Sequence, residues 1–305
     1  MIVRNKARTL VSRFRRTELG WRYASNLWPT INHRIRGETP ATPIERSLVN
    51  RLKSDGIAFT SVEELFADQR EFLAMDSAVN RLIESKNEEI TELRSKADEN
   101  EVGSKTFNLE MLGGELTFDP NSVFARFALH PTFLCIAEAY FGMFAKLRYY
   151  NVWKTFASKG SARESQLWHF DREDNYILKV FLYLDDVDEG AGPFTYAPGT
   201  HKKGKYRSID PEHFLEGGVR RTTDDQMRAV YPEERWVRAV GKKGTIIFAD
   251  TRGYHKGGEA RTKDRLMFTC MYTSPASESK RLIVYPDDLD LTTFTPQQRR
   301  ALQYK

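Results

Sequence analysis

Cysteine is scarce in this sequence, which has two among 305 residues. Cys135 and Cys270 lie in separate apolar segments with no C-x-x-C pair, which excludes a disulfide framework and a zinc knuckle. The sequence also lacks any uncharged apolar run of about 18 residues, which excludes a transmembrane helix. Because unpaired cysteines are typical of a reducing compartment, we expect a cytoplasmic protein.

Acidic residues are scarce at the start of the chain. Residues 1–36 carry nine lysines and arginines against Glu18 alone, a net charge of +8, while the whole chain has a net charge of +5. The rest of the chain therefore has a net charge of −3. Because the positive charge is confined to a basic N-terminal arm, residues 1–40, we expect no nucleic-acid partner.

The N-terminal arm has the spacing of an amphipathic helix. Its apolar residues follow one another at intervals of four, three and four: Val3, Ala7, Leu10 and Phe14. In a helix they share one face, and arginines surround them. Such a helix either makes a peripheral contact with an anionic membrane or acidic partner, or docks as a solvated basic helix on its own domain. No continuous apolar segment follows the positive start, so a secretory signal is not predicted.

Residues 41–144 predict mainly helices. Apolar residues recur at helical spacing, and Ser61 followed by Glu64 is typical of a capping box. Residues 77–100 are predicted as one charged helix. A more apolar helical region follows and is interrupted at Pro131.

Residues 145–275 predict short antiparallel strands. Segments rich in aromatic and β-branched residues alternate there with Gly, Pro and Asp clusters. Helices followed by strands predict an α+β fold, in which a sandwich or barrel has its outer sheet covered by the N-terminal helices. We expect one domain over residues 41–280, with a helical cover (41–144), a barrel core (145–275) and a C-terminal tail (281–305).

The segment "NYILKVFLYLDDV" predicts a strand with two different faces. One face is wholly aliphatic and contains Leu178, Val180, Leu182 and Leu184. The other face places Lys179 among aromatic residues. We expect the aliphatic face to pack beneath helices and the mixed face to look into the barrel. Lys179 then either binds an anion in the cavity or extends its ammonium group to water at the sheet edge.

Two histidines and one aspartate are candidate metal ligands. In "QLWHFD" His169 and Asp171 are two residues apart, so in a strand both side chains point to one side. An H-x-D tripeptide also arises by chance. His255 supplies a third ligand 84 residues later, just after a strand and turn. Two histidines and one carboxylate form the facial triad of non-haem Fe(II) oxygenases.

A facial triad leaves three coordination positions open. A 2-oxoacid can occupy two of them and O2 the third, while an arginine in the barrel pairs with the far carboxylate of 2-oxoglutarate. Arg265 shares its strand face with Met267 and Thr269, and Arg261 in the preceding loop is the alternative. Tyr149 and Asn151, two residues apart on another predicted strand, are candidates to line the cofactor pocket.

The ordered motifs "WHFD", "LKVFLYLDDVDEGAGPFTYAPGTH" and "DTRGYHKGGEARTKDRLMF" resemble the phytanoyl-CoA dioxygenase-like family of Fe(II)- and 2-oxoglutarate-dependent oxygenases. The resemblance covers roughly residues 105–275. It implies a double-stranded β-helix, the jelly-roll or cupin-like barrel, with iron bound by His169, Asp171 and His255. It also implies 2-oxoglutarate anchoring by Arg265. Relatives that halogenate lack the carboxylate ligand, so Asp171 favours hydroxylation.

We therefore expect a dioxygenase that hydroxylates a small organic substrate and releases succinate and CO2. The insertion at residues 207–235 indicates a polar or charged substrate, since it contains Arg220, Arg221, Arg228, Asp224 and Asp225. Two alternatives remain open: a catalytically silent jelly-roll binding protein, and a cupin-like iron enzyme that does not use 2-oxoglutarate. The oligomeric state does not follow from the sequence.

Overall fold

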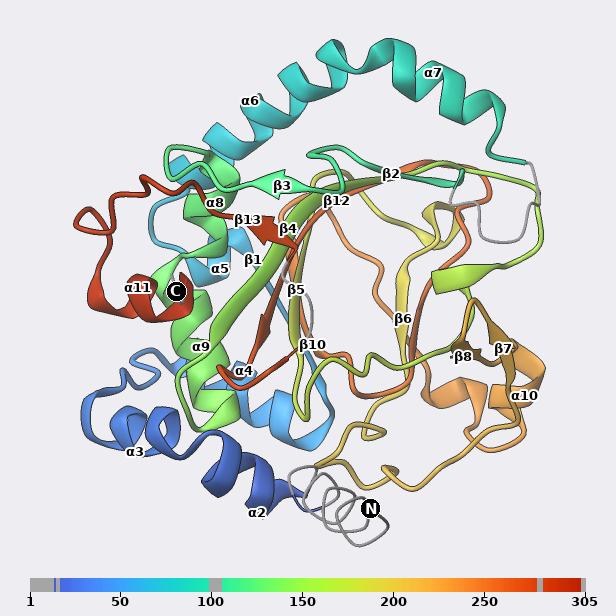
Figure 1. Cartoon of the computed structure of the whole chain (residues 1–305). Coiled ribbons are helices and arrows are strands. Elements are labelled where there is room, and N and C mark those ends of the chain that lie inside the picture. Colours follow the sequence, from blue (N-terminus) through green and yellow to red (C-terminus); the bar gives the residue numbers. More distant parts are fainter. Residues whose placement is uncertain (1–13, 15–16, 99–105, 279–281, 303–305) are drawn as a thin grey trace, which may run out of the picture.

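The computed structural model describes residue 14 and residues 17–98, 106–278 and 282–302 (Figure 1). Val3, Ala7 and Leu10 of the predicted amphipathic helix lie outside the described residues. Within the described part, no helix is both long enough and apolar enough to span a membrane.

Helices occupy mainly the first half of the chain and its end. The α-helices are α2 (Glu18–Gly20), α3 (Leu27–Arg36), α4 (Pro43–Ser54), α5 (Val62–Leu65), α6 (Arg70–Ser85), α7 (Asn87–Ser95), α8 (Val123–Ala128), α9 (Pro131–Phe141), α10 (Asp224–Arg228) and α11 (Pro296–Leu302). The strands are β1 (Ile57–Ser61), β2 (Asn108–Glu110), β3 (Leu116–Thr117), β4 (Lys146–Thr155), β5 (Leu178–Tyr183), β6 (Phe194–Tyr196), β7 (Phe214–Glu216), β8 (Val219–Arg221), β9 (Val237–Arg238), β10 (Thr245–Asp250), β11 (His255–Gly257), β12 (Arg265–Thr273) and β13 (Ile283–Val284).

Two sheets face each other across the centre of the molecule. The main sheet has the order β1-β10-β5-β12-β4-β2, and every neighbouring pair in it is antiparallel. A three-stranded sheet, β11-β6-β9, lies opposite (Figure 1). The predicted mixture of helix and sheet is therefore confirmed. The two sheets do not join into a closed barrel among the described residues, because isolated bridges, not continuous strands, connect them.

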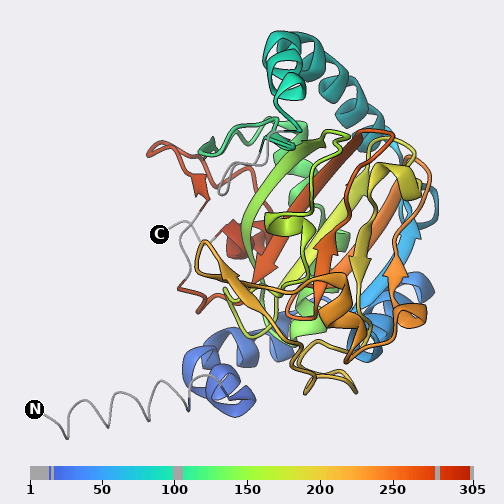
Figure 2. The same cartoon turned by 90° about the vertical axis from the view of Figure 1, so that its right-hand side faces the viewer.

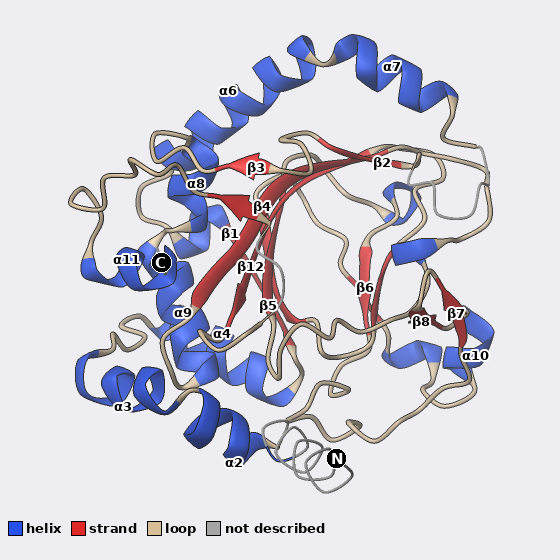
Figure 3. Cartoon of the chain, in the orientation of Figure 1, coloured by secondary structure: helices blue, strands red, loops and turns tan. Residues whose placement is uncertain are grey.

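The helices cover one face of the main sheet, with α4, α8 and α9 on that side in Figure 3. The aliphatic face of β5 points toward them: Leu178, Val180 and Leu182 are fully buried in the same apolar cluster as residues of α9. Burying such side chains is worth about 1.5–3 kcal/mol each. The prediction that this face packs beneath helices is confirmed.

The opposite face of β5 forms the layer between the two sheets. Phe181 and Tyr183 are buried there against Phe194 and Tyr196 of β6. Lys179 belongs to the same face, since side chains alternate along a strand. The mixed face thus looks toward the space between the sheets, as the sequence predicts.

The helices α6 and α7 correct one prediction. Residues 77–100 are predicted as one helix, but α6 ends at Ser85, the chain turns at Lys86 and α7 starts at Asn87. Both helices lie beyond one end of the sheets (Figure 2). Charged sequences do not reveal such a break, because helical spacing continues through it. The predicted interruption at Pro131 is confirmed, since Pro131 opens α9.

The N-terminal segment 17–36 packs on the body of the protein. The indole Nε1 of Trp21 donates to Asp174 at 2.6 Å, and the Tyr176 hydroxyl donates to Glu18 at 2.6 Å. Residues 172–177 connect Asp171 to β5, so this segment lies against the connection that carries a candidate metal ligand.

The C-terminal segment contains a helix that the sequence did not reveal. Gln297 of α11 donates to the Glu138 carboxylate of α9 at 3.2 Å, and both side chains are buried. Burial raises the pKa of Glu138 to about 7.

Glu138 predicts a pH-dependent stability. Its pKa is higher in the folded chain than the ordinary 4.5, so the folded state binds the proton preferentially. The free energy of unfolding should therefore fall as pH rises from about 4.5 to about 7, by about 1.4 kcal/mol per unit. Urea unfolding should show that Glu138→Gln removes this loss, whereas the exposed control Glu63→Gln keeps it. An unchanged pH dependence in Glu138→Gln would contradict the assignment.

Candidate metal centre

The backbone brings the two candidate histidine ligands side by side. His169 and His255 form an antiparallel bridge in which each N–H donates to the other residue's carbonyl at 2.9 Å. Directly opposed residues of an antiparallel pair project their side chains to the same face. The imidazole rings accordingly lie with their centroids 4.3 Å apart.

Each imidazole is held by a carbonyl two residues earlier in the chain. Nδ1 of His169 is 2.8 Å from the carbonyl oxygen of Leu167, and Nδ1 of His255 is 3.0 Å from that of Gly253. A carbonyl only accepts, so Nδ1 carries the proton and Nε2 keeps its lone pair. This arrangement orients imidazoles for metal binding, since a metal-bound histidine almost always donates its second N–H in this way.

Asp171 completes the group. Its backbone N–H donates to the Thr251 carbonyl at 2.8 Å, and the Arg252 guanidinium donates to the backbone carbonyl of Asp171 at 2.6 Å. One ligand atom from each of His169, Asp171 and His255 lies within 4.8 Å of the other two. Two imidazole nitrogens and one carboxylate oxygen at this separation fit a divalent transition metal.

Asp250 stabilises the turn that accepts a hydrogen bond from Asp171 and leads into His255. Its buried carboxylate accepts from the Tyr140 hydroxyl of α9 at 2.5 Å and from the backbone N–H of Arg252 at 3.0 Å. The helix that covers the outer face of the main sheet thus holds the turn that carries the candidate site.

Burial and charge set the protonation of these ligands. Burial lowers the pKa of His255 to about 4 and that of His169 well below its usual value, so both imidazoles are neutral at pH 7. Burial opposes ionisation of Asp171, but the Lys179 ammonium at 2.7 Å more than offsets it and holds the pKa of that carboxyl below its usual range. All three groups are therefore in the form that binds a metal at neutral pH.

The Lys179 ammonium forms an ion pair with the Asp171 carboxylate. Its neighbours across the strands are Met271 of β12 and, beyond it, Tyr149 of β4. Burial raises the pKa of Tyr149, so its phenol is protonated beside Lys179. The structure thus places Tyr149 near the triad.

Asn151 is directed elsewhere. Its amide group donates to the Glu110 carboxylate at 3.3 Å and to the Gly113 carbonyl at 3.0 Å, and its oxygen accepts from Leu112 and Val152. These bonds use both amide protons and both lone pairs of the oxygen. A cofactor contact by Asn151 would require one of them to break.

Arg265 presents an unpaired guanidinium in the interior. It is 5% exposed, and one nitrogen, Nη2, lies 3.4 Å from the Thr155 hydroxyl. Nε and Nη1 are buried without a hydrogen-bond partner among the described residues. Burial lowers the pKa of Arg265, which reflects the cost of a desolvated cation. Arg261, the alternative anchor, instead donates to the carbonyls of Ser158 and Gly160.

A second buried arginine faces the candidate ligands and was not singled out from the sequence. The antiparallel bridge between Trp168 and Thr222 places Arg221 opposite His169, on the face that carries the imidazoles. Arg221 pairs with Glu164 at 3.2 Å, while its Nη1 is buried without a partner among the described residues. The insertion at residues 207–235 was the available signal, but only the strand pairing selects this residue.

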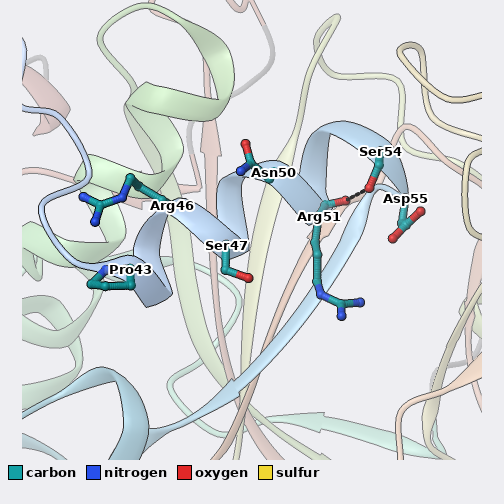
Figure 4. A pocket seen from close by; sticks show the side chains of 7 residues that line it. All are labelled: Pro43, Arg46, Ser47, Asn50, Arg51, Ser54 and Asp55. Carbon is teal, nitrogen blue, oxygen red and sulfur yellow. Dashed lines mark hydrogen bonds between the residues drawn. The ribbon is translucent and has the colours of Figure 1, made fainter.

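A surface hollow of about 740 Å³ lies elsewhere. It is lined by Arg46, Asn50, Arg51 and other residues of α4, on the outer side of the protein (Figure 4). None of the candidate ligands contributes to it, so it has no part in this site.

The carboxylate of Asp171 predicts the metal dependence of the site. Asp171→Asn keeps the shape but removes the charge that balances a dication, so Fe(II) affinity should fall by at least about 100-fold. Anaerobic calorimetry measures this, with circular dichroism to check the fold. The exposed control Asp185→Asn should bind Fe(II) as the parent does, and full Fe(II) affinity in Asp171→Asn would contradict the ligand assignment.

Three solved structures are similar to this chain. AviO1 from Streptomyces viridochromogenes has a TM-score of 0.50 and 20% sequence identity, with coverage of 79% of this chain and 99% of that chain. EctD from S. alaskensis with bound Fe has a TM-score of 0.49 and 16% identity, with 81% and 82% covered. The epimerase SnoN, in complex with Fe3+, alpha ketoglutarate and nogalamycin RO, has a TM-score of 0.46 and 18% identity, with 76% and 84% covered.

At 20% identity the likeness to AviO1 shows the fold alone. No curated protein sequence matches the chain. A family model, phytanoyl-CoA dioxygenase (PhyH), matches residues 55–267. This match starts earlier than the resemblance at residues 105–275 and includes β1 of the main sheet. It contains the three candidate ligands, and the chain belongs to the phytanoyl-CoA dioxygenase (PhyH) family.

Proposed function

We propose that the protein is an Fe(II)- and 2-oxoglutarate-dependent dioxygenase that hydroxylates a small polar or charged organic substrate. Bound iron, with 2-oxoglutarate and O2, supplies the oxidation, in which the oxoacid becomes succinate and CO2. Two features together carry the proposal. The first is the group of His169, Asp171 and His255, and the second is the buried Arg265 guanidinium on β12, whose Nε and Nη1 have no hydrogen-bond partner among the described residues.

Each of the three proposed ligands would offer one atom to the metal. His169 and His255 offer Nε2 while their Nδ1 protons stay on backbone carbonyls. Asp171 offers one carboxylate oxygen, since the other lies 2.7 Å from the Lys179 ammonium. Lys179 thereby favours binding through a single oxygen, which leaves a coordination position for the oxoacid and O2.

Arg265 has the position and the unmet hydrogen bonds of an oxoacid anchor. A Cβ built on Gly257 would lie 3.6 Å from its Nη2, and Gly257 is two residues beyond His255 on the same strand face. The glycine therefore leaves the space between His255 and Arg265 free of side chain. The far carboxylate of 2-oxoglutarate would satisfy Nε and Nη1 in a two-pronged contact.

The reaction type follows from the complete ligand set. Asp171 occupies the position where halogenating relatives have a small residue, so a halide has no vacant site at the metal. Hydroxylation is the proposal that this carboxylate supports. Lys179 and Tyr149 are assigned to the oxoacid and O2 side of the metal, where an ammonium and a neutral phenol can donate hydrogen bonds.

Arg221 supports a polar or charged substrate. Two other arginines of the insertion form ion pairs on the surface, Arg220 with Asp210 and Arg228 with Asp225. Arg221 instead is buried opposite His169. It is ion-paired with Glu164 and Glu216, but its Nη1 has no hydrogen-bond partner among the described residues, so it can donate to a substrate oxygen. We place this chemistry in residues 41–280 and in a reducing cytoplasm, which keeps buried Cys135 and Cys270 as thiols.

The oxoacid site gives the test of this function. Anaerobic titration of the parent protein with Fe(II) and 2-oxoglutarate should produce the weak visible charge-transfer band of a chelated oxoacid. Arg265→Met removes two charged hydrogen bonds worth about 1.5–3 kcal/mol each, so the oxoacid concentration for half-saturation should rise by about 100-fold or more.

A matched control isolates the role of Arg265. Arg261→Met removes a nearby arginine that donates to backbone carbonyls, and it should keep the parent affinity for 2-oxoglutarate. Iron binding without any band in the parent protein would indicate a cupin-like iron enzyme that uses no oxoacid. Failure of the parent to bind iron would indicate the silent binding protein.

A further inference from the structure

Among the described residues, the N-terminal helices carry an apolar strip that is left exposed. We define this exposed apolar strip by the residues Leu19, Tyr23, Leu27, Trp28, Ile31 and Ile35. Trp28 and Ile35 are each 71% exposed, and Leu19 is 64% exposed. The strip runs along α2 and α3, the dark blue helices of Figure 1. Isolated exposed apolar residues are ordinary, but a continuous set marks an interaction surface.

The opposite face of α3 anchors it to the protein, which fixes the strip outward. Thr30 is fully buried, and the His33 ring packs edge-on against Phe144. Just before the helix, the buried Asn26 amide donates to the Ser274 hydroxyl at 3.1 Å. Leu27, Ile31 and Ile35 are spaced by four residues, so they share the face that points away from these contacts.

A positively charged hollow borders the strip. It has a volume of about 460 Å³ and is lined by Trp28, Arg36, Phe144 and Arg300 among others. The Arg300 guanidinium lies 4.1 Å from the centre of the Phe144 ring, and its Nε has no hydrogen-bond partner among the described residues. Within the described part of the chain, neither arginine forms an ion pair.

We propose that the exposed apolar strip and its hollow dock on an anionic phospholipid surface. Tryptophan and aliphatic residues bordered by arginines are the composition of helices that lie in a membrane interface. The hollow gives Arg36 and Arg300 access to a lipid phosphate. The net charge of +8 over residues 1–36 complements such a surface, whereas a second copy of the chain would bring the same charge and be repelled.

This surface is separate from the proposed catalytic function. No candidate metal ligand and neither Arg265 nor Arg221 belongs to it. It also differs from the contact predicted for the amphipathic helix of Val3, Ala7, Leu10 and Phe14, because the residues that carry it are mainly those of α3 and the hollow. Loss of lipid binding and loss of oxoacid binding are therefore distinguishable in the same protein.

Vesicle sedimentation with the full chain tests the proposal. The protein should sediment with vesicles of phosphatidylcholine mixed with phosphatidylserine and stay in solution with phosphatidylcholine alone. The triple variant Trp28→Ser, Ile31→Ser, Ile35→Ser should bind at least about tenfold more weakly, because each change removes apolar area from the interface. Leu73→Ser on α6, also an exposed leucine at 59%, is the matched control and should bind as the parent.

The arginines have their own expected effect. Arg36→Gln and Arg300→Gln should each weaken binding by about fivefold, and added salt should reduce the parent's binding because it screens the charge. Equal binding to both vesicle types, or undiminished binding by the triple variant, would overturn the proposal. Self-association that the triple variant abolishes, without vesicle binding, would overturn it in favour of a second copy.

Discussion

Two backbone hydrogen bonds between His169 and His255 are the constraint on which the site depends. They join a segment between the sheets to β11 and set both imidazoles on one face. The carbonyls of Leu167 and Gly253, each two residues before its histidine, then fix which ring nitrogen stays free. Main-chain pairing thus sets the relative positions of the candidate ligands.

The two faces of the main sheet have different roles. The outer face packs against the helices, and the inner face carries residues of the candidate site. On its outer side, Leu178 and Val180 pack with the helices in a fully buried apolar cluster. On its inner side, the same strand presents Lys179 to Asp171, and β12 presents Arg265. Because side chains alternate along each strand, one set of strands serves both purposes. Asp250 accepts a hydrogen bond from Tyr140 of α9, so the outer layer also holds the turn beside the candidate metal ligands.

Local patterns predicted much of this arrangement. The two-residue period assigned the faces of β5 and put His169 and Asp171 on one side, and both follow from neighbours in the sequence. The positions of other site residues depend on contacts between segments that are far apart in the sequence. Arg221 gains its position from a bridge to a segment more than fifty residues away, and Asn151 makes three hydrogen bonds to the distant residues 110–113. The helix break at Lys86 and the unclosed barrel also depend on packing that periodicity does not encode.

The hydrogen bond from Trp21 to Asp174 bears on where the catalytic unit begins. The sequence predicts residues 1–40 as a separable arm. The Trp21 indole nevertheless donates to the Asp174 carboxylate, and burial raises the pKa of that carboxyl group. A chain cut at residue 40 would remove one donor to that carboxylate, at a cost of about 1 kcal/mol, and would leave the backbone N–H donors of Asn175 and Ser274. The loosened segment would be the one that follows Asp171. The segment that carries Asp171 is therefore held by a contact that lies upstream of the family match at residues 55–267.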